Sequence, residues 1–153
     1  MASMTRIRLG WKLLISAVAL AALVYAAGQS KMKVITPADK QPGKVFSAGL
    51  RYGDTLYVSG QIGVGKDGKV PANFEDEIRQ CFTNIHDVLQ AGGMDYSDVV
   101  SVQVYLTDMD LFQRFNAVYT QFFHEPLPTR TAVGVVRLAA AAAHAEITVT
   151  ARK

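Results

Sequence analysis

An arginine opens a stretch with the alternation of a β-strand, PTRTAVGVVRL, which runs from Pro128 to Leu138. Alternation places Arg130 on the strand side that also carries Ala132 and Val136, which are small or apolar. A guanidinium among such residues must be paired, be solvated at an edge, or hold an anion. Its two parallel N–H donors match a carboxylate, so Arg130 suits 2-oxo acids and related ligands. The residue pattern alone leaves open a surface strand with scattered charges.

A carboxylate in the next predicted strand is the second candidate for chemistry. Glu146 lies early in the strand 145–151, on the same side as two threonines. If the strands 130–138 and 145–151 pair as a hairpin, Arg130 and Glu146 fall toward its opposite ends. We therefore expect no direct salt bridge between them within one chain.

Two motifs that could indicate other chemistry lack the context that they need. Ser59-Gly60-Gln61 has no G-x-S-x-G elbow, so Ser59 is predicted to line a pocket rather than to act as a nucleophile. GVGKDG, residues 63–68, matches G-x-G-x-x-G, but a dinucleotide site needs a helix directly after it, and here a proline intervenes. We interpret this stretch as a hairpin turn.

Neither a cofactor nor a metal ion is expected. The three histidines, His86, His124 and His144, show no paired metal-ligand spacing. The one cysteine, Cys81, cannot form an internal disulfide, and it excludes a cysteine-based metal site.

Hydrophobic spacing predicts the elements that must position these residues. Helices are predicted from the N-cap Asn73 to Gly92 and over about 110–123, and strands at 32–35, 55–63, 99–107, 130–138 and 145–151. The order β-β-α-β-α-β-β predicts a mixed α+β sheet with both helices on one face. The strands carry apolar or small residues on both sides, and an uncovered apolar face usually marks a partner surface. We therefore predict a homo-oligomer whose sheets pack around each other.

The N-terminus has the pattern of an export signal. Arg6, Arg8 and Lys12 precede an apolar run from Leu13 to Ala27, which is short for a membrane-spanning helix. Residues 1–27 are predicted to be a signal peptide or an N-terminal membrane anchor, and residues 28–153 the functional domain. In both cases the domain is expected outside the cytoplasm, either periplasmic or secreted, or anchored there through an uncleaved segment.

The charge balance argues against a nucleic-acid partner. Of the 16 basic residues three precede Gly28, where no acidic residue occurs, so 13 basic and 13 acidic residues remain in the domain. A domain without net charge lacks the electrostatic footprint for nucleic acid. The length, 153 residues, leaves room for one domain of ordinary size.

Three stretches together resemble the RidA/YjgF family of reactive-intermediate deaminases: LYVSGQIG, LTDMDLFQRFNAVYTQFF and PLPTRTAVGVVRL. The resemblance covers roughly residues 31–153, and its most specific piece is P-x-R-[ST] opening a strand that runs on to an R-L pair. It implies a chorismate-mutase-like fold and a homotrimer, in which three sheets face inward as a barrel. The sites would lie in clefts between subunits.

The resemblance also implies an activity and site residues. The family hydrolyses 2-imino or enamine acids to 2-oxo acids and ammonia without a cofactor or metal. By position, Arg130 matches the carboxylate-binding arginine, and Glu146 the glutamate that positions the attacking water, with one extra residue in the connection before it. Besides Arg130, the substrate-binding positions of the family fall on Phe46, Ser59, Gly60 and Asn116.

Three departures from the family pattern accompany these matches. Phe46 stands where the deaminases often carry tyrosine, and Ala132 where many carry cysteine. An alanine run, 139–143, replaces the usual polar connection between the last two strands. The arginine-based anion site is retained, so the departures are expected to affect substrate range and rate.

The expected reaction is hydrolytic deamination. Imine hydrolysis needs the substrate carboxylate fixed, the C=N bond exposed to one water, and a base that orients the water. Arg130 is expected to supply the first and Glu146 the last. Non-catalytic binding or sensing of small carboxylates in the same cleft is the alternative, because it needs Arg130 but not Glu146.

Overall fold

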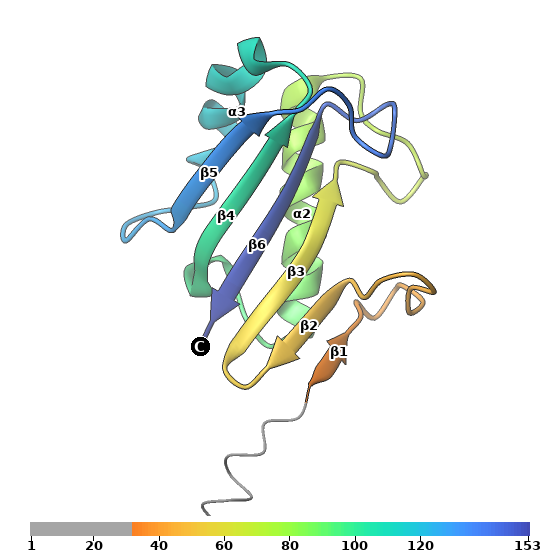
Figure 1. Ribbon diagram of the computed structural model, residues 1–153, viewed down its shortest axis with the longest axis vertical. Helices are drawn as coiled ribbons and strands as arrows, with labels where there is room; N and C mark the ends of the chain where they lie inside the picture. The colour runs from red at the N-terminus through yellow and green to blue at the C-terminus, as the bar shows by residue number, and fades with distance from the viewer. Residues whose placement is uncertain (1–31) are drawn as a thin grey trace, which may run out of the picture. The chain divides into compact units, whose positions relative to one another are not determined.

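Two helices cover one face of a six-stranded sheet, whose strand order is β1-β2-β3-β6-β4-β5 (Figure 1). The computed structural model describes residues 32–153. The helices are α2 (Phe74–Ala91) and α3 (Phe112–Tyr119), with short 3-10 turns η1 (Tyr96–Asp98) and η2 (Met109–Leu111). The strands are β1 (Lys33–Ile35), β2 (Gly49–Tyr52), β3 (Thr55–Ile62), β4 (Val99–Leu106), β5 (Thr129–Gly134) and β6 (Ala145–Arg152).

The predicted mixed α+β class, with both helices on one face, is confirmed. The segment 1–27, predicted as a signal peptide or membrane anchor, lies outside the described residues. Between residues 32 and 153, no helix combines the length and hydropathy that crossing a membrane requires. One strand was missing from the prediction, since β2 has only four residues between a long polar loop and a tight turn at Gly53. Such a segment is too short to show a period.

The last two strands do not form a hairpin, the pairing under which Arg130 and Glu146 were expected at opposite ends. Strand β6 runs antiparallel to both β3 and β4 and lies between them, whereas β5 runs parallel to β4 at the edge of the sheet. The reason is burial. Alternate residues of β6, from Ala145 to Ala151, are almost completely buried, as a central strand requires, while no residue of β5 is fully buried.

Helix α2 begins and ends where the sequence predicted. The Asn73 side chain accepts a hydrogen bond from the Asp76 amide at 3.0 Å, and three acidic residues occupy the first turn. Gly92 caps the other end, and Gly93 follows with a φ of 74°, a left-handed conformation that favours glycine. The apolar stripe of the helix packs on the sheet and includes Cys81, and burial raises the pKa of this thiol, so it stays protonated and inert.

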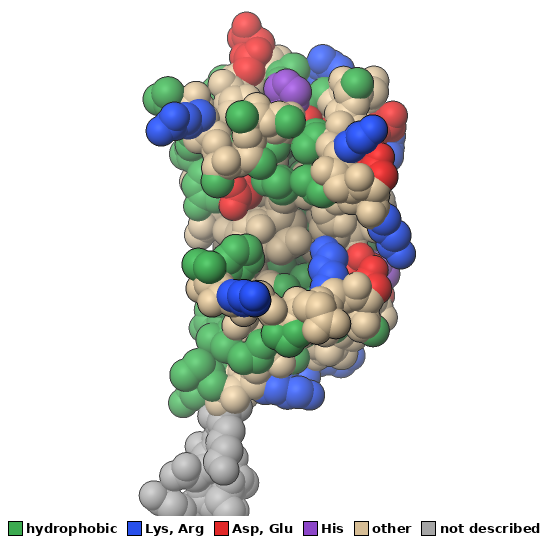
Figure 2. All heavy atoms as spheres, turned by 90° about the vertical axis from the view of Figure 1, so that its right-hand side faces the viewer, with side chains coloured by type: hydrophobic (Ala, Val, Ile, Leu, Met, Phe, Trp, Pro, Cys, Tyr) green, Lys and Arg blue, Asp and Glu red, His purple; other side chains and the backbone are tan. Residues whose placement is uncertain are grey.

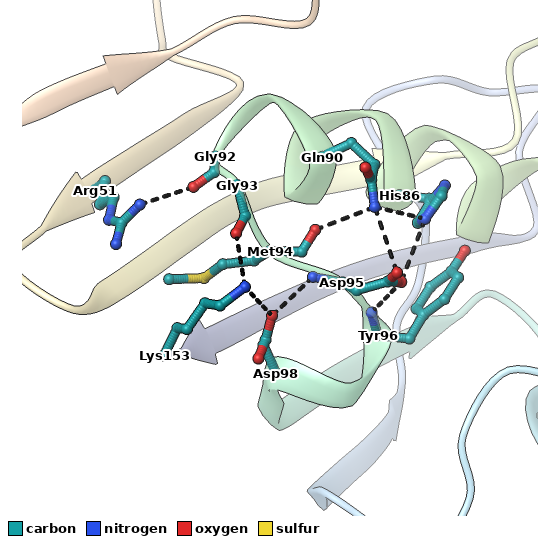
Figure 3. Close-up of polar contacts among 10 residues, drawn as sticks. All are labelled: Arg51, His86, Gln90, Gly92, Gly93, Met94, Asp95, Tyr96, Asp98 and Lys153. Atoms are coloured by element: carbon teal, nitrogen blue, oxygen red, sulfur yellow. Dashed lines mark hydrogen bonds and ion pairs between the residues drawn. The ribbon is translucent and has the colours of Figure 1, made fainter.

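Basic side chains satisfy backbone carbonyls where α2 ends (Figure 3). Arg51 of β2 donates to the Gly92 carbonyl at 2.9 Å, and Lys153 donates to the Gly93 carbonyl at 3.3 Å. Cations are favourable at this end of a helix because its last carbonyls are unpaired. The polar cluster in Figure 3 therefore ties the end of α2 to β2 and to Lys153. Its role is structural.

A bidentate ion pair fastens α3 to α2. Arg114 donates from Nε and Nη2 to the two carboxylate oxygens of Glu75, each at 2.7 Å. Hydrogen bonding to Arg114 lowers the pKa of the Glu75 carboxyl from 4.5 to about 2. The folded-state pKa is thus depressed, so the pair stabilises the fold above the unfolded value, and this stability is lost as pH falls toward 2.

We expect Glu75→Gln to lower the urea midpoint of unfolding at pH 7 and to have no effect near pH 2. The measurement is urea unfolding at a series of pH values. Asp76→Asn is the matched control, because Asp76 in the same turn pairs with Arg79 of its own helix. An equal effect of Glu75→Gln at both pH extremes would contradict the assigned role of the ion pair.

Candidate functional site

Arg130 lies on the helix-covered side of β5. It pairs in register with Val102 of β4, which is fully buried beneath the helices. The carbon at the centre of the guanidinium lies over three aromatic rings of η2–α3: 4.5 Å from the ring centre of Tyr119, 5.4 Å from Phe112 and 6.0 Å from Phe115. These distances are in the range of cation–π attraction.

Most described arginines have their donors engaged by a polar partner. Arg114 and Arg152 pair with carboxylates, Arg79 pairs within its helix, and Arg51 donates to a carbonyl. Within residues 32–153, Arg130 and Arg137 have neither an ion pair nor a side-chain hydrogen bond. Arg130 is therefore held by rings while its N–H donors remain available for an anion.

Glu146 lies on the opposite side of the sheet, which no helix covers. Its neighbours Ala145 and Ile147 are fully buried toward the helices, so the Glu146 side chain points the other way. It lines a pocket of about 340 Å³ at the end of the sheet. The other residues of this pocket come from β3, β4, β6 and the loop after β5: Gly60, Tyr105, Val135, Arg137, Leu138, Ala139 and Thr148.

A β-bulge brings Gly60 against Glu146. Strand β3 pairs with β6 through Val58 and Gln61, and one extra residue lies between these two positions. Such a bulge re-aims the backbone. A Cβ on Gly60 would overlap a carboxylate oxygen of Glu146 and lie 2.8 Å from its Cδ, so only glycine lets the carboxylate lie over the strand.

A second, buried carboxylate fixes the start of β6. Glu77 of α2 is 0% exposed, and it accepts hydrogen bonds from the backbone amides of His144 and Ala145 at 2.6 and 3.2 Å. Its other oxygen lies 2.8 Å from Nδ1 of His144. Both carboxylate oxygens therefore have hydrogen-bonding partners, as a buried carboxyl group requires. Glu77 therefore holds the chain two residues before Glu146.

Ser59 and Phe46 both lie near Gly60, Ser59 as its neighbour in β3 and Phe46 in the loop before β2. The Ser59 hydroxyl donates to the Ser47 carbonyl at 2.7 Å, and its amide donates to Ala48, so it ties the loop before β2 to the bulge. Phe46 in that loop is 66% exposed. With Gly60 it lines a groove of about 450 Å³ beside α2, on the hollowed side of the molecule that faces the viewer in Figure 2.

Asn116 lies on the side of α3 that carries the rings supporting Arg130. It follows Phe112 by one helical turn and precedes Tyr119, so it lies on the same stripe of α3 as the rings beneath the guanidinium. Its amide nitrogen is 3.5 Å from Gln113, and its buried Oδ1 has no hydrogen-bond partner among the described residues. A buried carbonyl oxygen without a donor is costly, so this side chain is suited to a partner that the single chain does not supply.

The structure thus places four of the six predicted site residues in two half-sites. Arg130 and Asn116 form one on the helix side at the sheet edge, and Glu146 with Gly60 forms the other on the uncovered face. Ser59 precedes Gly60, and Phe46 shares with Gly60 the groove beside α2, but neither lines the Glu146 pocket. Arg130 and Glu146 pair in register with β4 residues three positions apart and point to opposite faces. The expectation that they form no salt bridge within one chain is confirmed for the described residues, but for this reason and not because of a hairpin.

Sequence reasoning missed two contributions to these half-sites. Arg137 lines the Glu146 pocket, and its only signal was the R-L pair after the strand. The aromatic residues of the second helix have the spacing of an apolar core-facing stripe, yet they also form the support of Arg130. An aromatic stripe facing an arginine strand carries no sequence signal that separates these two roles.

The fold and the half-sites define a class of protein: a small α+β domain with an arginine stacked on aromatic rings at a sheet edge and a carboxylate on the uncovered face. A family profile described as Endoribonuclease L-PSP matches residues 36–153. The chain is 38% identical over 110 residues to a Dermatophagoides farinae protein named 2-iminobutanoate/2-iminopropanoate deaminase, a match that covers 71% of this chain and 86% of the relative.

Solved structures agree with this match. Yeast Mmf1 superposes with a TM-score of 0.75 at 30% identity, covering 80% of this chain and 99% of that one. Escherichia coli TdcF, whose structure contains bound serine, superposes with a TM-score of 0.72 at 32% identity, covering 79% and 98%. This chain belongs to the Endoribonuclease L-PSP family, which confirms the RidA/YjgF resemblance seen in the sequence.

Gly60→Ala is expected to displace the Glu146 carboxylate while leaving the fold intact, because the new Cβ meets the far end of a flexible side chain. We expect the free energy of unfolding to change by less than about 1 kcal/mol. A crystal structure of the variant should show the carboxylate turned away from residue 60.

Gly49→Ala is the matched control, since its Cβ would lie 2.7 Å from Val88 Cγ1 in the packed core. Overpacking there should cost about 1–3 kcal/mol. A Gly60→Ala variant that unfolds as readily as Gly49→Ala, or that keeps Glu146 in place, would contradict the assigned close approach.

Proposed function

We propose that this protein hydrolyses 2-imino or enamine acids to 2-oxo acids and ammonia. The observation that carries the proposal is the Arg130 guanidinium, which rests on aromatic rings and has no carboxylate partner among the described residues. A planar carboxylate can accept two parallel hydrogen bonds from such a group. The deaminase name of the mite relative supports the same substrate class.

In the proposed reaction, Arg130 binds the substrate carboxylate and thereby fixes the position of the adjacent C=N carbon. Glu146 accepts a proton from a water molecule as the water oxygen bonds to that carbon, and the C=N π electrons move to nitrogen. Glu146 then returns the proton to the nitrogen. The hydroxyl proton of the resulting carbinolamine then passes through Glu146 to the same nitrogen, and as the oxygen forms the carbonyl of the 2-oxo acid the C–N bond breaks and ammonia leaves.

We also propose that each site combines Arg130 of one copy with Glu146 of another. The two side chains point to opposite faces of one sheet, so a single chain gives one substrate no access to both. Arg130 lies on an edge strand, where it can reach past the sheet, and the uncovered face beside Glu146 exposes apolar side chains, among them Val133 at 40% and Tyr57 at 51%. A homotrimer closed around this face accounts for both features.

Arg130→Lys should keep the fold and the charge but lose most of the affinity for 2-oxobutanoate, because a lysine ammonium cannot form the two parallel hydrogen bonds that a guanidinium makes to one carboxylate. The expected loss is about 30-fold or more, equivalent to about 2 kcal/mol. Glu146→Gln should bind 2-oxobutanoate normally while turnover falls, because it keeps the size of the side chain but removes the base.

The measurements are calorimetric titration with 2-oxobutanoate and ammonia release from freshly generated 2-iminopropanoate. Arg130→Ala serves as the full-loss reference. Wild-type behaviour of Arg130→Lys in both assays would show that the anion site is misassigned. A wild type that binds 2-oxobutanoate but releases no ammonia would instead support a carboxylate-binding protein without catalysis.

Co-expression of Arg130→Ala and Glu146→Gln chains should restore part of the activity that each variant lacks alone. If copies assort at random in a closed ring, roughly a quarter of the sites combine two intact residues. Ammonia release by the co-purified mixture tests this, and light scattering of the wild type should give the mass of a trimer. A mixture no more active than the single variants would place both residues in a site of one copy.

A further inference from the structure

We infer that Tyr119 is a positioning residue for the substrate carboxylate: its ring holds the Arg130 guanidinium in a fixed plane, with the N–H edge free for the ligand. The inference rests on the proposed function, because it concerns the same arginine. Tyr119 is the nearest of the three rings, with its centre 4.5 Å from the guanidinium carbon.

The Tyr119 ring is itself immobile. It is 6% exposed and packs against Phe123 and Phe115, with ring centres 4.7 and 5.9 Å away. Helix α3, which carries it, is fastened to α2 by the Arg114–Glu75 pair. A side chain packed on a fixed ring loses little further freedom when a ligand binds, whereas a free arginine loses substantial rotamer entropy.

Support by rings rather than by a carboxylate leaves the hydrogen-bond donors of Arg130 available. Arg114 shows the alternative, because Glu75 occupies its Nε–Nη2 edge. An arginine held in that way has one of its two paired-donor edges occupied and its charge already matched by a carboxylate. A ring face attracts the cation through its quadrupole and uses none of the in-plane N–H groups. Tyr119 can therefore orient Arg130 and leave its carboxylate-binding edge unoccupied.

Tyr119→Leu should weaken 2-oxobutanoate binding about 3- to 10-fold, the range expected for losing one cation–π contact. In the proposed reaction KM should rise by a similar factor with kcat nearly unchanged, because Arg130 contacts the carboxylate both before and during the chemical step. Tyr119→Phe keeps the ring and should retain most of the affinity.

Phe123→Leu is the matched control. Phe123 is 4% exposed and packs in the same aromatic cluster, but it makes no cation–π contact with Arg130. It should lose stability with little change in affinity. In an Arg130→Gln background, Tyr119→Leu should weaken binding no further, since the two side chains act through one interaction. Phe112→Leu, which alters the second ring at a half-exposed position, provides the test if Tyr119→Leu does not fold.

The outcomes separate the two proposals. Failure of the wild type to bind 2-oxobutanoate, or no loss of binding in Arg130→Ala, overturns the proposed function. Loss of binding in Arg130→Ala together with wild-type affinity in Tyr119→Leu overturns only the positioning role. Equal losses in Tyr119→Leu and Phe123→Leu, or an undiminished loss in the Arg130→Gln background, would also reject it. If Phe112→Leu is used instead, wild-type affinity in that variant would likewise reject the positioning role of the rings.

Discussion

The central position of β6 is the constraint on which the rest of the structure depends. Its alternate residues, Ala145, Ile147, Val149 and Ala151, are at most 2% exposed, so this strand must lie under the helices with a neighbour on each side. Once β3 and β4 flank it antiparallel, β5 can only add at the free side of β4, as an edge strand. The same alternation that buries Ala145 and Ile147 turns Glu146 to the uncovered face.

Each half-site is consequently supported by a different layer of the molecule. Arg130 is supported from the helix layer, by rings that belong to the core on their other side. Glu146 is supported within the sheet, by the bulge at Gly60 and by the buried Glu77 that fixes the preceding residues. Sheet and helices are packed against each other, so the geometry of both half-sites is set by one hydrophobic core.

Short-range features such as helix ends could be predicted from the sequence, whereas the long-range pairing of strands could not. The N-cap Asn73 and the glycines after Ala91 marked α2 because their effects act within a few residues. The partner of β5 depends on which strand is more completely buried, and because β6 and β5 both alternate, the sequence did not decide between a hairpin with β6 and pairing with another strand. The candidate residues were found through motif resemblance, but their division between two faces required the register of β4 with both of its neighbours.

Two of the three departures from the deaminase pattern lie near one half-site each, Ala132 beside Arg130 and Phe46 beside Gly60. Ala132 lies two residues after Arg130 on the same side of β5 and packs against the core. Phe46 lies in the loop that Ser59 ties to the bulge, beside Gly60. Each departure removes a polar group, and neither alters the arginine or the carboxylate. Under the proposed function, the charged groups recognise the substrate carboxylate and neutral groups shape the rest of the cleft, so we expect these substitutions to alter which substrate side chain is accepted.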